Sequence, residues 1–315
     1  MISVIMPVYN GEKFVAQALQ SVQAQTVSDW ELVAVNDGSR DGTQGILEGF
    51  ARGDGRIRLL SQPNGGVSVA RNAAMAAARG DYFAFLDADD RWYPGHLAQL
   101  EGMIAAYPQA GLLASAYDIL FPDGRRGDTT AYFAGKPQTL FFEDFLAAYA
   151  QDKAAKCFTM STTCIKAASA RRAGGFRPGC RIGEDLALTL RIALEEPAAL
   201  CGHKTALYRK AYSTATRTTS FDPDWYFFQE AEKLMADPAI PAPRRESLGR
   251  LMAWFGVRRV RHYLVGGRRR EAKEALRQLG RPAGLERELG LTRLLMLLPT
   301  WAVRQLFLLR WRSRA

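Results

Sequence analysis

The sequence lacks most features of secreted, membrane-spanning and metal-cluster proteins. Its 315 residues include four cysteines, at positions 157, 164, 180 and 201, without a CxxC pair or a zinc-like spacing to histidine. Such cysteines are typical of ordinary thiols in a reducing compartment. The chain begins in an apolar segment without the basic region and cleavage site of a signal peptide, so we interpret its beginning as a first strand.

Several other patterns are missing. No stretch of eighteen or more apolar residues is free of charges, which argues against a spanning helix. No GxGxxG motif follows a strand and no GxxxxGK[ST] motif occurs, which argues against a dehydrogenase and a P-loop NTPase. His96, His203 and His262 are scattered, and we interpret them as structural or surface residues. Hydrophobic residues make up 48% of the chain, enough for one large α/β domain with an extension, or for two domains.

The net charge of +10 is distributed unevenly. From Arg244 to the end there are 18 Lys and Arg against 5 Asp and Glu, whereas the first 243 residues hold 24 basic and 27 acidic residues. A basic tail rich in leucine and tryptophan is typical of a protein that binds a membrane surface. A nucleic-acid-binding protein would be basic over more of its length, so no nucleic-acid partner is expected.

Strand and helix patterns alternate four times in the first third of the chain. This alternation predicts a doubly wound, mostly parallel α/β sheet with helices on both faces. Ligands of such sheets bind beyond the carboxyl ends of the strands, where Asn10, Asp37 and the cluster 87–90 fall. The expected strands are 3–8, 30–35, 56–60 and 82–86, and the expected helices are 12–25, 43–52 and 68–79, with a further helix at about 95–107.

The remainder of the chain has a looser pattern. Residues 126–155 give no clear signal, and two or three helices are expected after Arg244, separated at Gly266-Gly267 and at Pro282. We therefore expect one domain over 1–215 and a helical, basic extension over 216–315. The other expected elements are strands at about 111–120, 159–166 and 200–209, a hairpin at 122–124, and helices at 167–173 and 184–194.

Two groups of carboxylates are candidate functional residues. In an extended segment Asp87 and Asp89 point the same way, about 6.6 Å apart at Cα. Such a pair suits one Mg²⁺ or Mn²⁺ ion, with phosphate oxygens completing its coordination shell. A solvated acidic turn has the same sequence pattern. Glu184 and Asp185 stand at a predicted helix start, which favours carboxylates, and one of them could be a general base.

Other polar residues allow two interpretations each. Asp37 could bind a base or a ribose, or could belong to an ordinary Asp-Gly turn. Arg71-Asn72 and Arg209 are candidate diphosphate contacts or surface residues.

Taken in order, these motifs resemble family 2 glycosyltransferases of the GT-A fold. The resemblance extends over roughly residues 1–215, and it is the order of the motifs that makes it specific. The matching segments are 4–10 (VIMPVYN), 21–26 (SVQAQT), 35–43 (VNDGSRDGT), 64–72 (NGGVSVARN), 80–82 (GDY), 85–90 (FLDADD), 174–176 (GGF), 183–185 (GED) and 208–209 (YR).

The resemblance implies a role for each matching residue. Residues 1–115 would form the nucleotide-sugar-binding half and 116–215 the acceptor-binding half. Asp185 would be the catalytic base with Glu184 beside it, and Asp89 and Asp87 would bind the metal. The donor site would consist of Pro7, Tyr9, Asn10, Asp37 on the base, Arg71 on the diphosphate, Asp87 on the ribose, and Arg209.

The resemblance also implies the reaction. It would be a single displacement with inversion, from a nucleotide-sugar that is commonly UDP-linked to a glycan or lipid-linked acceptor. The absence of the QxxRW motif of processive synthases favours transfer of one sugar per encounter. The family often has a His two residues after the Tyr-Arg pair; here Ala211 stands there, and the diphosphate contact of that loop passes to Arg217 or is missing.

Two other classes of function remain open at this point. A nucleotidyltransferase would share the sheet and the paired carboxylates, but it usually has a glycine-rich basic loop where this chain has residues 9–11, Tyr-Asn-Gly. A non-enzymatic protein that binds membranes or nucleic acid through its tail would leave the acidic motifs unexplained.

The tail itself predicts a location. Residues 285–315 combine leucines with Trp301, Trp311 and six arginines, which suits the inner surface of the cytoplasmic membrane. The alternative is that this stretch packs on the rest of the protein or on a second copy.

Overall fold

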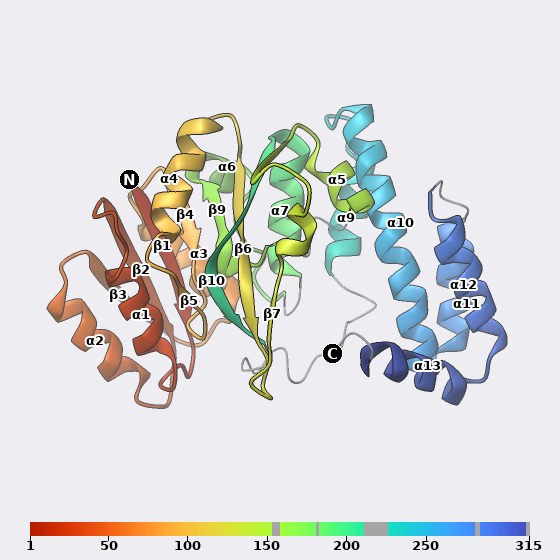
Figure 1. The fold of residues 1–315 in the computed structure, drawn as a ribbon, viewed down its shortest axis with the longest axis horizontal. Helices are drawn as coiled ribbons and strands as arrows, with labels where there is room; N and C mark the ends of the chain where they lie inside the picture. The colour runs from red at the N-terminus through yellow and green to blue at the C-terminus, as the bar shows by residue number, and fades with distance from the viewer. Residues whose placement is uncertain (153–157, 181–182, 211–225, 281–283, 313–315) are drawn as a thin grey trace. The chain divides into compact units, whose positions relative to one another are not determined.

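The protein consists of two compact units. The computed structural model describes residues 1–152, 158–180, 183–210, 226–280 and 284–312 (Figure 1). The first unit is Met1–Ser220 and the second is Phe221–Ala315.

The first unit is built on one twisted sheet whose first half is parallel. Its strands are ordered β3-β2-β1-β4, with all neighbours parallel. Every residue of β1 and β2 is buried, as expected for a sheet covered on both faces. These elements are β1 (Ile2–Val8), α1 (Val15–Gln23), β2 (Trp30–Asp37), α2 (Thr43–Gly53), β3 (Ile57–Gln62), α3 (Val67–Ala77) and β4 (Tyr82–Phe85).

The second half of the sheet is mixed. Strand β9 (Thr163–Lys166) pairs antiparallel with β4 on one side and with β6 (Leu112–Leu120) on the other. Strand β10 (Ala198–Arg209) is parallel to β6. Two antiparallel steps restore the direction, so β6 and β10 run the same way as β1 and β4. Their carboxyl ends therefore lie at the same edge of the sheet as those of the first half.

Most predicted elements of the first unit are confirmed, and the α/β class with them. The predicted hairpin at 122–124 joins β6 to β7 (Arg126–Asp128), and the predicted helices become α4 (His96–Ala106), α6 (Ala167–Arg172) and α7 (Glu184–Glu195). Several short elements were not predicted, because their periodicity is too brief to detect. These are β5 (Arg91–Trp92), β8 (Thr139–Phe142), α5 (Phe145–Asp152) and two 3-10 turns, Thr130–Phe133 and Met160–Thr162.

The second unit is helical, and its helices are more numerous than expected. The elements are α9 (Tyr226–Ala236), α10 (Ala242–Val265), α11 (Arg269–Leu279), α12 (Glu286–Leu297) and α13 (Thr300–Arg312). The prediction of two or three helices after Arg244 is wrong, because Pro299, which lacks an N–H, separates α12 from α13. The break at Gly266-Gly267 is confirmed, while Pro282 lies outside the described residues.

Arginines and a small apolar core hold these helices together. Val260 and Leu264 of α10 pack with Leu295 of α12 and Val303 of α13. Arg269 donates hydrogen bonds to the carbonyl oxygens of Met296 and Leu298, which caps the last turn of α12. Within the described part of the chain, none of the helices has the length and apolar character needed to cross a membrane.

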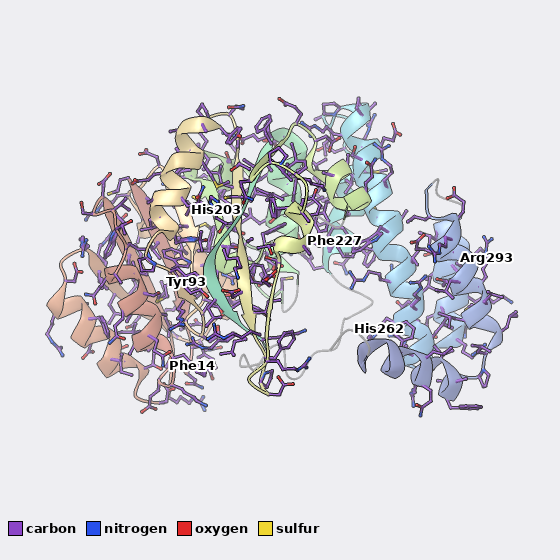
Figure 2. All side chains as sticks on the ribbon, viewed as in Figure 1. Phe14, Tyr93, His203, Phe227, His262 and Arg293 are labelled. Atoms are coloured by element: carbon purple, nitrogen blue, oxygen red, sulfur yellow. The ribbon has the colours of Figure 1, made fainter. Side chains whose placement is uncertain are left out.

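His96 is a buried structural residue of the first unit, as the sequence indicated. Its Nδ1 lies 2.6 Å from the Thr205 hydroxyl oxygen, and the ring of Trp92 stacks on it at 4.1 Å between centroids. Burial lowers the pKa of His96 to about 3. His203, in contrast, is exposed on β10 (Figure 2).

This burial predicts a pH dependence of stability. The unfolded chain, with a histidine pKa of about 6.5, takes up a proton before the folded one does. The contribution of neutral His96 is therefore present above pH ~6.5 and is lost as the pH falls toward 3. We expect a loss of about 2 kcal/mol between pH 7 and pH 5 in urea unfolding. In a His96→Gln variant, this dependence of the unfolding free energy on pH should disappear. An unchanged pH dependence would show that other groups cause it.

Candidate active site

The carboxyl end of β2 carries a buried carboxylate that organises a neighbouring turn. Asp37 is 2% exposed and accepts hydrogen bonds from the backbone N–H groups of Gly65 and Gly66, both at 2.8 Å, and from Gln62 Nε2 at 2.7 Å. Gly38 has φ +72°, and a Cβ there would lie 2.7 Å from the backbone nitrogen of Asn64. The turn at 64–66 is thereby fixed directly above β2. Asp37 has a structural role here, and its contact with a base stays a prediction.

The end of β1 is tied to the loop after β2. Asn10 adopts a left-handed backbone with φ 48°, which asparagine tolerates. Its backbone N–H donates to the Ser39 hydroxyl and its side-chain oxygen accepts from the Arg40 N–H, both at 2.9 Å. Pro7 is buried within β1, whereas Tyr9 just beyond it is 46% exposed. Tyr9 is thus an accessible aromatic side chain at the strand end.

The acidic cluster after β4 is held from two sides. Asp90 is fully buried, and its carboxylate accepts from the Ser161 hydroxyl at 2.5 Å and from the Arg209 N–H at 2.8 Å. Ser161 also accepts from the Asp87 N–H at 3.1 Å. The Arg209 guanidinium donates to the backbone carbonyl of Asp89 at 2.5 Å. The turn before β9 and the end of β10 therefore fix the loop that presents Asp87 and Asp89.

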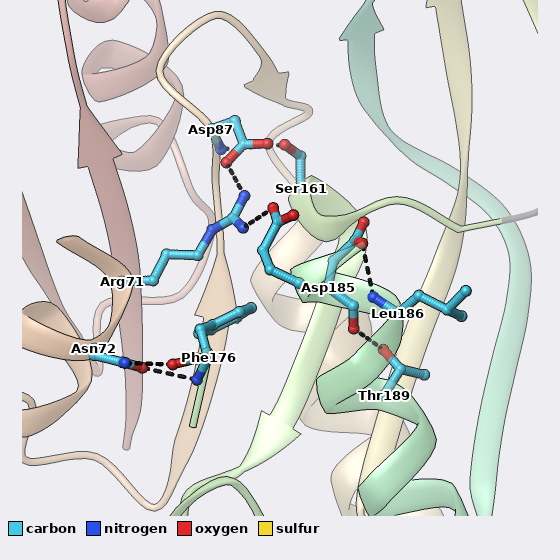
Figure 3. A network of polar contacts seen from close by, with 9 residues as sticks. Arg71, Asn72, Asp87, Ser161, Phe176, Asp185, Leu186 and Thr189 are labelled. Carbon is cyan, nitrogen blue, oxygen red and sulfur yellow. Dashed lines mark hydrogen bonds and ion pairs between the residues drawn. The ribbon is translucent and has the colours of Figure 1, made fainter. Parts of the chain in front are cut away.

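Arg71 connects this loop to the start of α7 (Figure 3). Its guanidinium donates to Asp87 Oδ1 at 2.8 Å and to Glu184 Oε1 at 3.0 Å. The side chain is 4% exposed, against 31% for Asp87 and 12% for Glu184. Burial opposes the charged form, but Asp87 and Glu184 outweigh it, and the pKa of Arg71 is raised. Arg71 therefore holds the two predicted carboxylate motifs together, and its contact with a diphosphate remains a prediction.

The first turn of α7 carries two carboxylates in different surroundings. Burial, with neighbouring Asp185, raises the pKa of Glu184 to about 7. The Asp185 carboxylate accepts the Leu186 backbone N–H at 2.7 Å, and Figure 3 shows it beside the Arg71 network. Glu184 is paired with Arg71, and the assignment of the general base to Asp185 stays a prediction.

Asn72 and Phe176 explain why two distant motifs occur together. The Asn72 amide donates to the Phe176 carbonyl at 2.7 Å and accepts its N–H at 2.8 Å. The Phe176 ring packs edge-on against Phe85 and lies 5.1 Å from the Arg71 guanidinium carbon. Gly175 has φ +68°, and a Cβ there would approach the Asn72 side-chain oxygen to 2.7 Å. The segment 174–176 thus supports Arg71 from below.

The structure brings most of the predicted site residues to one edge of the sheet. Asp87, Asp89, Arg71, Glu184 and Arg209 are joined by contacts, and Asp185 adjoins them. Pro7, Tyr9, Asn10 and Asp37 end the neighbouring strands β1 and β2. Arg217 lies outside the described residues.

Sequence reasoning gave no role to three residues that support this site. These are Ser161, Gln17, which accepts from Arg209 at 2.6 Å, and Asp90. Only Asp90 had a local signal, its place in the acidic cluster.

The carboxylates after β4 suit a divalent cation. Burial and the nearby Asp87 raise the pKa of Asp89 to about 6. The surrounding positive groups therefore do not fully balance the negative charge of these carboxylates. A cation would relieve it. Among the described residues there is no cluster of three or more His, Cys, Asp or Glu side chains that could hold a metal. Mg²⁺ commonly takes only one or two carboxylates and completes its shell with substrate phosphates and water. The expectation of an extended segment is wrong, because residues 87–90 form a turn that is closed by the Asp90 N–H donating to the Asp87 carbonyl at 3.0 Å. Asp87 and Asp89 supply two carboxylates at this turn, and their binding of a metal stays a prediction.

Comparison with known proteins identifies the family. The model of the family described as Glycosyl transferase family 2 matches residues 3–168, more than half of the chain. The chain belongs to this family. The matched segment contains the ends of β1, β2 and β4 and the Arg71 motif, but not α7. The family description favours the glycosyltransferase interpretation over a nucleotidyltransferase.

Two relatives of this family 2 member come from Bacillus subtilis. EpsJ of Bacillus subtilis, described as an uncharacterized glycosyltransferase, is 47% identical over 90 residues, 29% of this chain and 26% of EpsJ. TuaG of the same organism, described as a putative teichuronic acid biosynthesis glycosyltransferase, is 36% identical over 148 residues, 46% of this chain and 57% of TuaG. The chain thus matches less than two thirds of the length of each.

Solved structures share the fold. TarS of S. aureus in complex with UDP-GlcNAc has a TM-score of 0.65 at 19% identity, covering 80% of this chain and 72% of TarS. The mannosyltransferase PcManGT of Pyrobaculum calidifontis, in complex with GDP-Man and Mn²⁺, has a TM-score of 0.60 at 18% identity. It covers 98% of this chain and 84% of PcManGT. These similarities confirm the GT-A-like fold.

The buried bridge predicts a large stability effect. Arg71→Met removes the cation between Asp87 and Glu184 and leaves a buried carboxylate uncompensated, so we expect a loss of about 3–5 kcal/mol in urea unfolding at pH 7. Arg40→Met, at an exposed arginine whose backbone makes the contact with Asn10, is the matched control and should change little. A loss below about 1 kcal/mol for Arg71→Met would show that the bridge contributes little to folding.

Proposed function

We propose that this chain is an inverting glycosyltransferase that moves one sugar from a nucleotide-sugar, with UDP as the nucleotide, to a hydroxyl group of its acceptor. The observation that carries this proposal is the Arg71 bridge, because it places the acidic donor motif next to the first turn of α7. A donor-binding group and a proton acceptor are the two parts that this reaction requires. The nucleotide-sugars in the TarS and PcManGT complexes support the donor class.

The residues divide the chemistry between them. Asp185 takes the proton of the acceptor hydroxyl, whose oxygen then forms a bond to the anomeric carbon. The bond between that carbon and the diphosphate oxygen breaks on the opposite face, which inverts the configuration. Asp89 and Asp87 would hold Mg²⁺ or Mn²⁺, which offsets the negative charge of the departing diphosphate.

Other residues position the donor. Tyr9, Pro7 and Asn10 lie at the end of β1 and Asp37 at the end of β2, where parallel α/β sheets bind ligands. We assign the nucleotide to these strand ends. Arg209 fixes the Asp89 backbone, and we assign its guanidinium to diphosphate binding as well.

We propose an acceptor from bacterial cell-surface polysaccharide synthesis, either a glycan or a lipid-linked sugar. The support is the relative TuaG, whose description names teichuronic acid biosynthesis. The acceptor would bind over the half of the first unit formed by residues 116–215, and the reaction would take place on the cytoplasmic side of the membrane.

A thermal-shift experiment tests the donor assignment. UDP, GDP and ADP are compared with and without Mn²⁺, followed by the corresponding nucleotide-sugars. Binding to the folded state stabilises it by about 2.7 kcal/mol when the ligand is present at 100 times its Kd. We expect the largest Mn²⁺-dependent shift with UDP. A shift with GDP alone would reassign the nucleotide, and no shift with any diphosphate would contradict the proposed function.

A further inference from the structure

Helix α12 carries leucine side chains on two opposite sides. Its inner side chains Leu289 and Leu295 are buried, and Leu295 belongs to the core shared with α10. Leu294 and Leu297 point outward instead and are 61% and 80% exposed. The sequence-based alternative, in which the whole stretch packs on protein, therefore holds for only one side of the helix.

The three exposed leucines of α12 lie along one side of that helix, and further exposed apolar residues follow on α13. Positions three apart lie along one side of a helix, so Leu291, Leu294 and Leu297 align. Trp301, 70% exposed, follows at the start of α13, and Leu306 is exposed farther along it. We call these five residues the outer apolar face.

Exposed leucines are not a general property of this unit. Helix α11 faces water with Arg270, Lys273 and Arg277, and its buried side chain is Ala272. A surface helix in water normally has that arrangement. A cluster of large apolar side chains exposed on α12 and α13 marks a surface that meets an apolar partner.

The charges beside the face indicate which partner. Arg287 and Arg293 are exposed and flank the leucines of α12 (Arg293 is labelled in Figure 2), and exposed Arg304 lies on α13. Residues 285–315 contain six arginines against two glutamates. A second copy of the chain would bring the same positive charge to the interface. An anionic lipid surface complements it, because apolar side chains enter the acyl region while arginines reach the headgroups.

We propose that α12 and α13 bind an anionic membrane surface through the outer apolar face, lying in the plane of the interface. Helices of 12 and 13 residues are about 18–20 Å long, shorter than the ~30 Å hydrocarbon core. Trp301 suits the headgroup level. Membrane binding itself is inferred from the exposed surface. Only its purpose, which is to bring the enzyme to a lipid-linked acceptor, rests on the proposed function. The structure does not describe the side chains of Arg310, Trp311, Arg312 and Arg314.

Vesicle sedimentation of the full chain without nucleotide tests the proposal. Vesicles of 30% phosphatidylglycerol in phosphatidylcholine are compared with pure phosphatidylcholine at low and high salt. We expect pelleting with the anionic vesicles that weakens with salt. The double variant Leu294→Gln/Leu297→Gln should bind at least roughly tenfold more weakly, since each leucine loses its apolar burial. Met235→Gln, at an exposed apolar side chain on α9, is the matched control and should bind normally.

A charge-matched pair separates position from net charge. Arg287→Gln/Arg293→Gln should weaken binding roughly fivefold per residue. Arg270→Gln/Arg277→Gln on α11 removes the same charge and should weaken it much less. Equal effects of the two double variants would show that overall charge alone attracts the protein to the vesicles, and would contradict a defined binding face.

Two further outcomes overturn the proposal. One is equal pelleting of the parent and the leucine variant, or no pelleting of either. The other is a dimer in sedimentation velocity that the leucine variant abolishes, which would assign the face to a second copy. The thermal shift with UDP and Mn²⁺, measured on the same variants, should stay unchanged. Its absence in the parent would contradict the proposed function and leave the vesicle result intact.

Discussion

Asp89→Ala is expected to abolish metal-dependent donor binding while the fold survives. Asp89 is the second carboxylate of the motif after β4, and its loss leaves Asp87, which already pairs with Arg71, as the remaining ligand. We expect the affinity for UDP in the presence of Mn²⁺ to fall at least roughly 100-fold, since even outer-shell changes cost 10–100-fold in metal sites. Calorimetric titration of UDP with and without Mn²⁺ measures this directly.

The structure explains why the fold should tolerate this change. Arg209 bonds the backbone carbonyl of Asp89, which alanine retains, whereas the side chain of neighbouring Asp90 is bonded to Ser161 and to the Arg209 N–H. Asp123→Ala, at an exposed carboxylate of the β6–β7 hairpin, is the matched control. Unchanged Mn²⁺-dependent affinity for UDP in the Asp89 variant would remove the metal assignment.

The sequence predicted the first half of the fold well because long, regular signals coincide there. Apolar strands such as 30–35 alternate there with amphipathic helices. In α1, for example, the apolar residues Val15, Ala18, Leu19 and Val22 lie on one face, and all four are buried. The antiparallel insertion of β9 between β4 and β6 could not be predicted, because pairing between distant strands leaves no local pattern. The number of helices predicted after Arg244 was too small. The apolar pattern continues past Pro299, where the structure has a break between α12 and α13.

The sequence indicated the set of candidate residues but not the contacts between them. Turn chemistry and carboxylate spacing indicated Asp37, Asp87 and Asp89. The sequence left open whether Arg71 contacts a diphosphate or lies at the surface, and the structure shows it buried between Asp87 and Glu184. Ser161 had no signal at all, because its hydroxyl acts on a loop 71 residues away. A side chain that supports a site from a distant element is found only once the fold brings the two together.

Asp185→Asn is expected to remove sugar transfer while leaving donor affinity nearly intact. The replacement has the same shape, and its side-chain oxygen can still accept the Leu186 N–H that Asp185 binds at 2.7 Å, so α7 should begin as before. Asparagine cannot take a proton from the acceptor. Since a general base typically contributes about 10²–10⁴-fold, we expect a loss of that size in kcat. The measurements are UDP release from UDP-sugar, with water or a sugar acceptor, and the Kd of UDP.

Glu184→Gln is the matched control, since it removes the adjacent carboxylate but keeps an oxygen that can accept the Arg71 hydrogen bond. Its expected effect on kcat is much smaller, because the Glu184 carboxylate is already engaged by the Arg71 guanidinium. The two variants together separate the base from its neighbour. Near-normal turnover in Asp185→Asn with a collapse in Glu184→Gln would transfer the base to Glu184. A loss of UDP affinity in Asp185→Asn would instead indicate that Asp185 binds the donor.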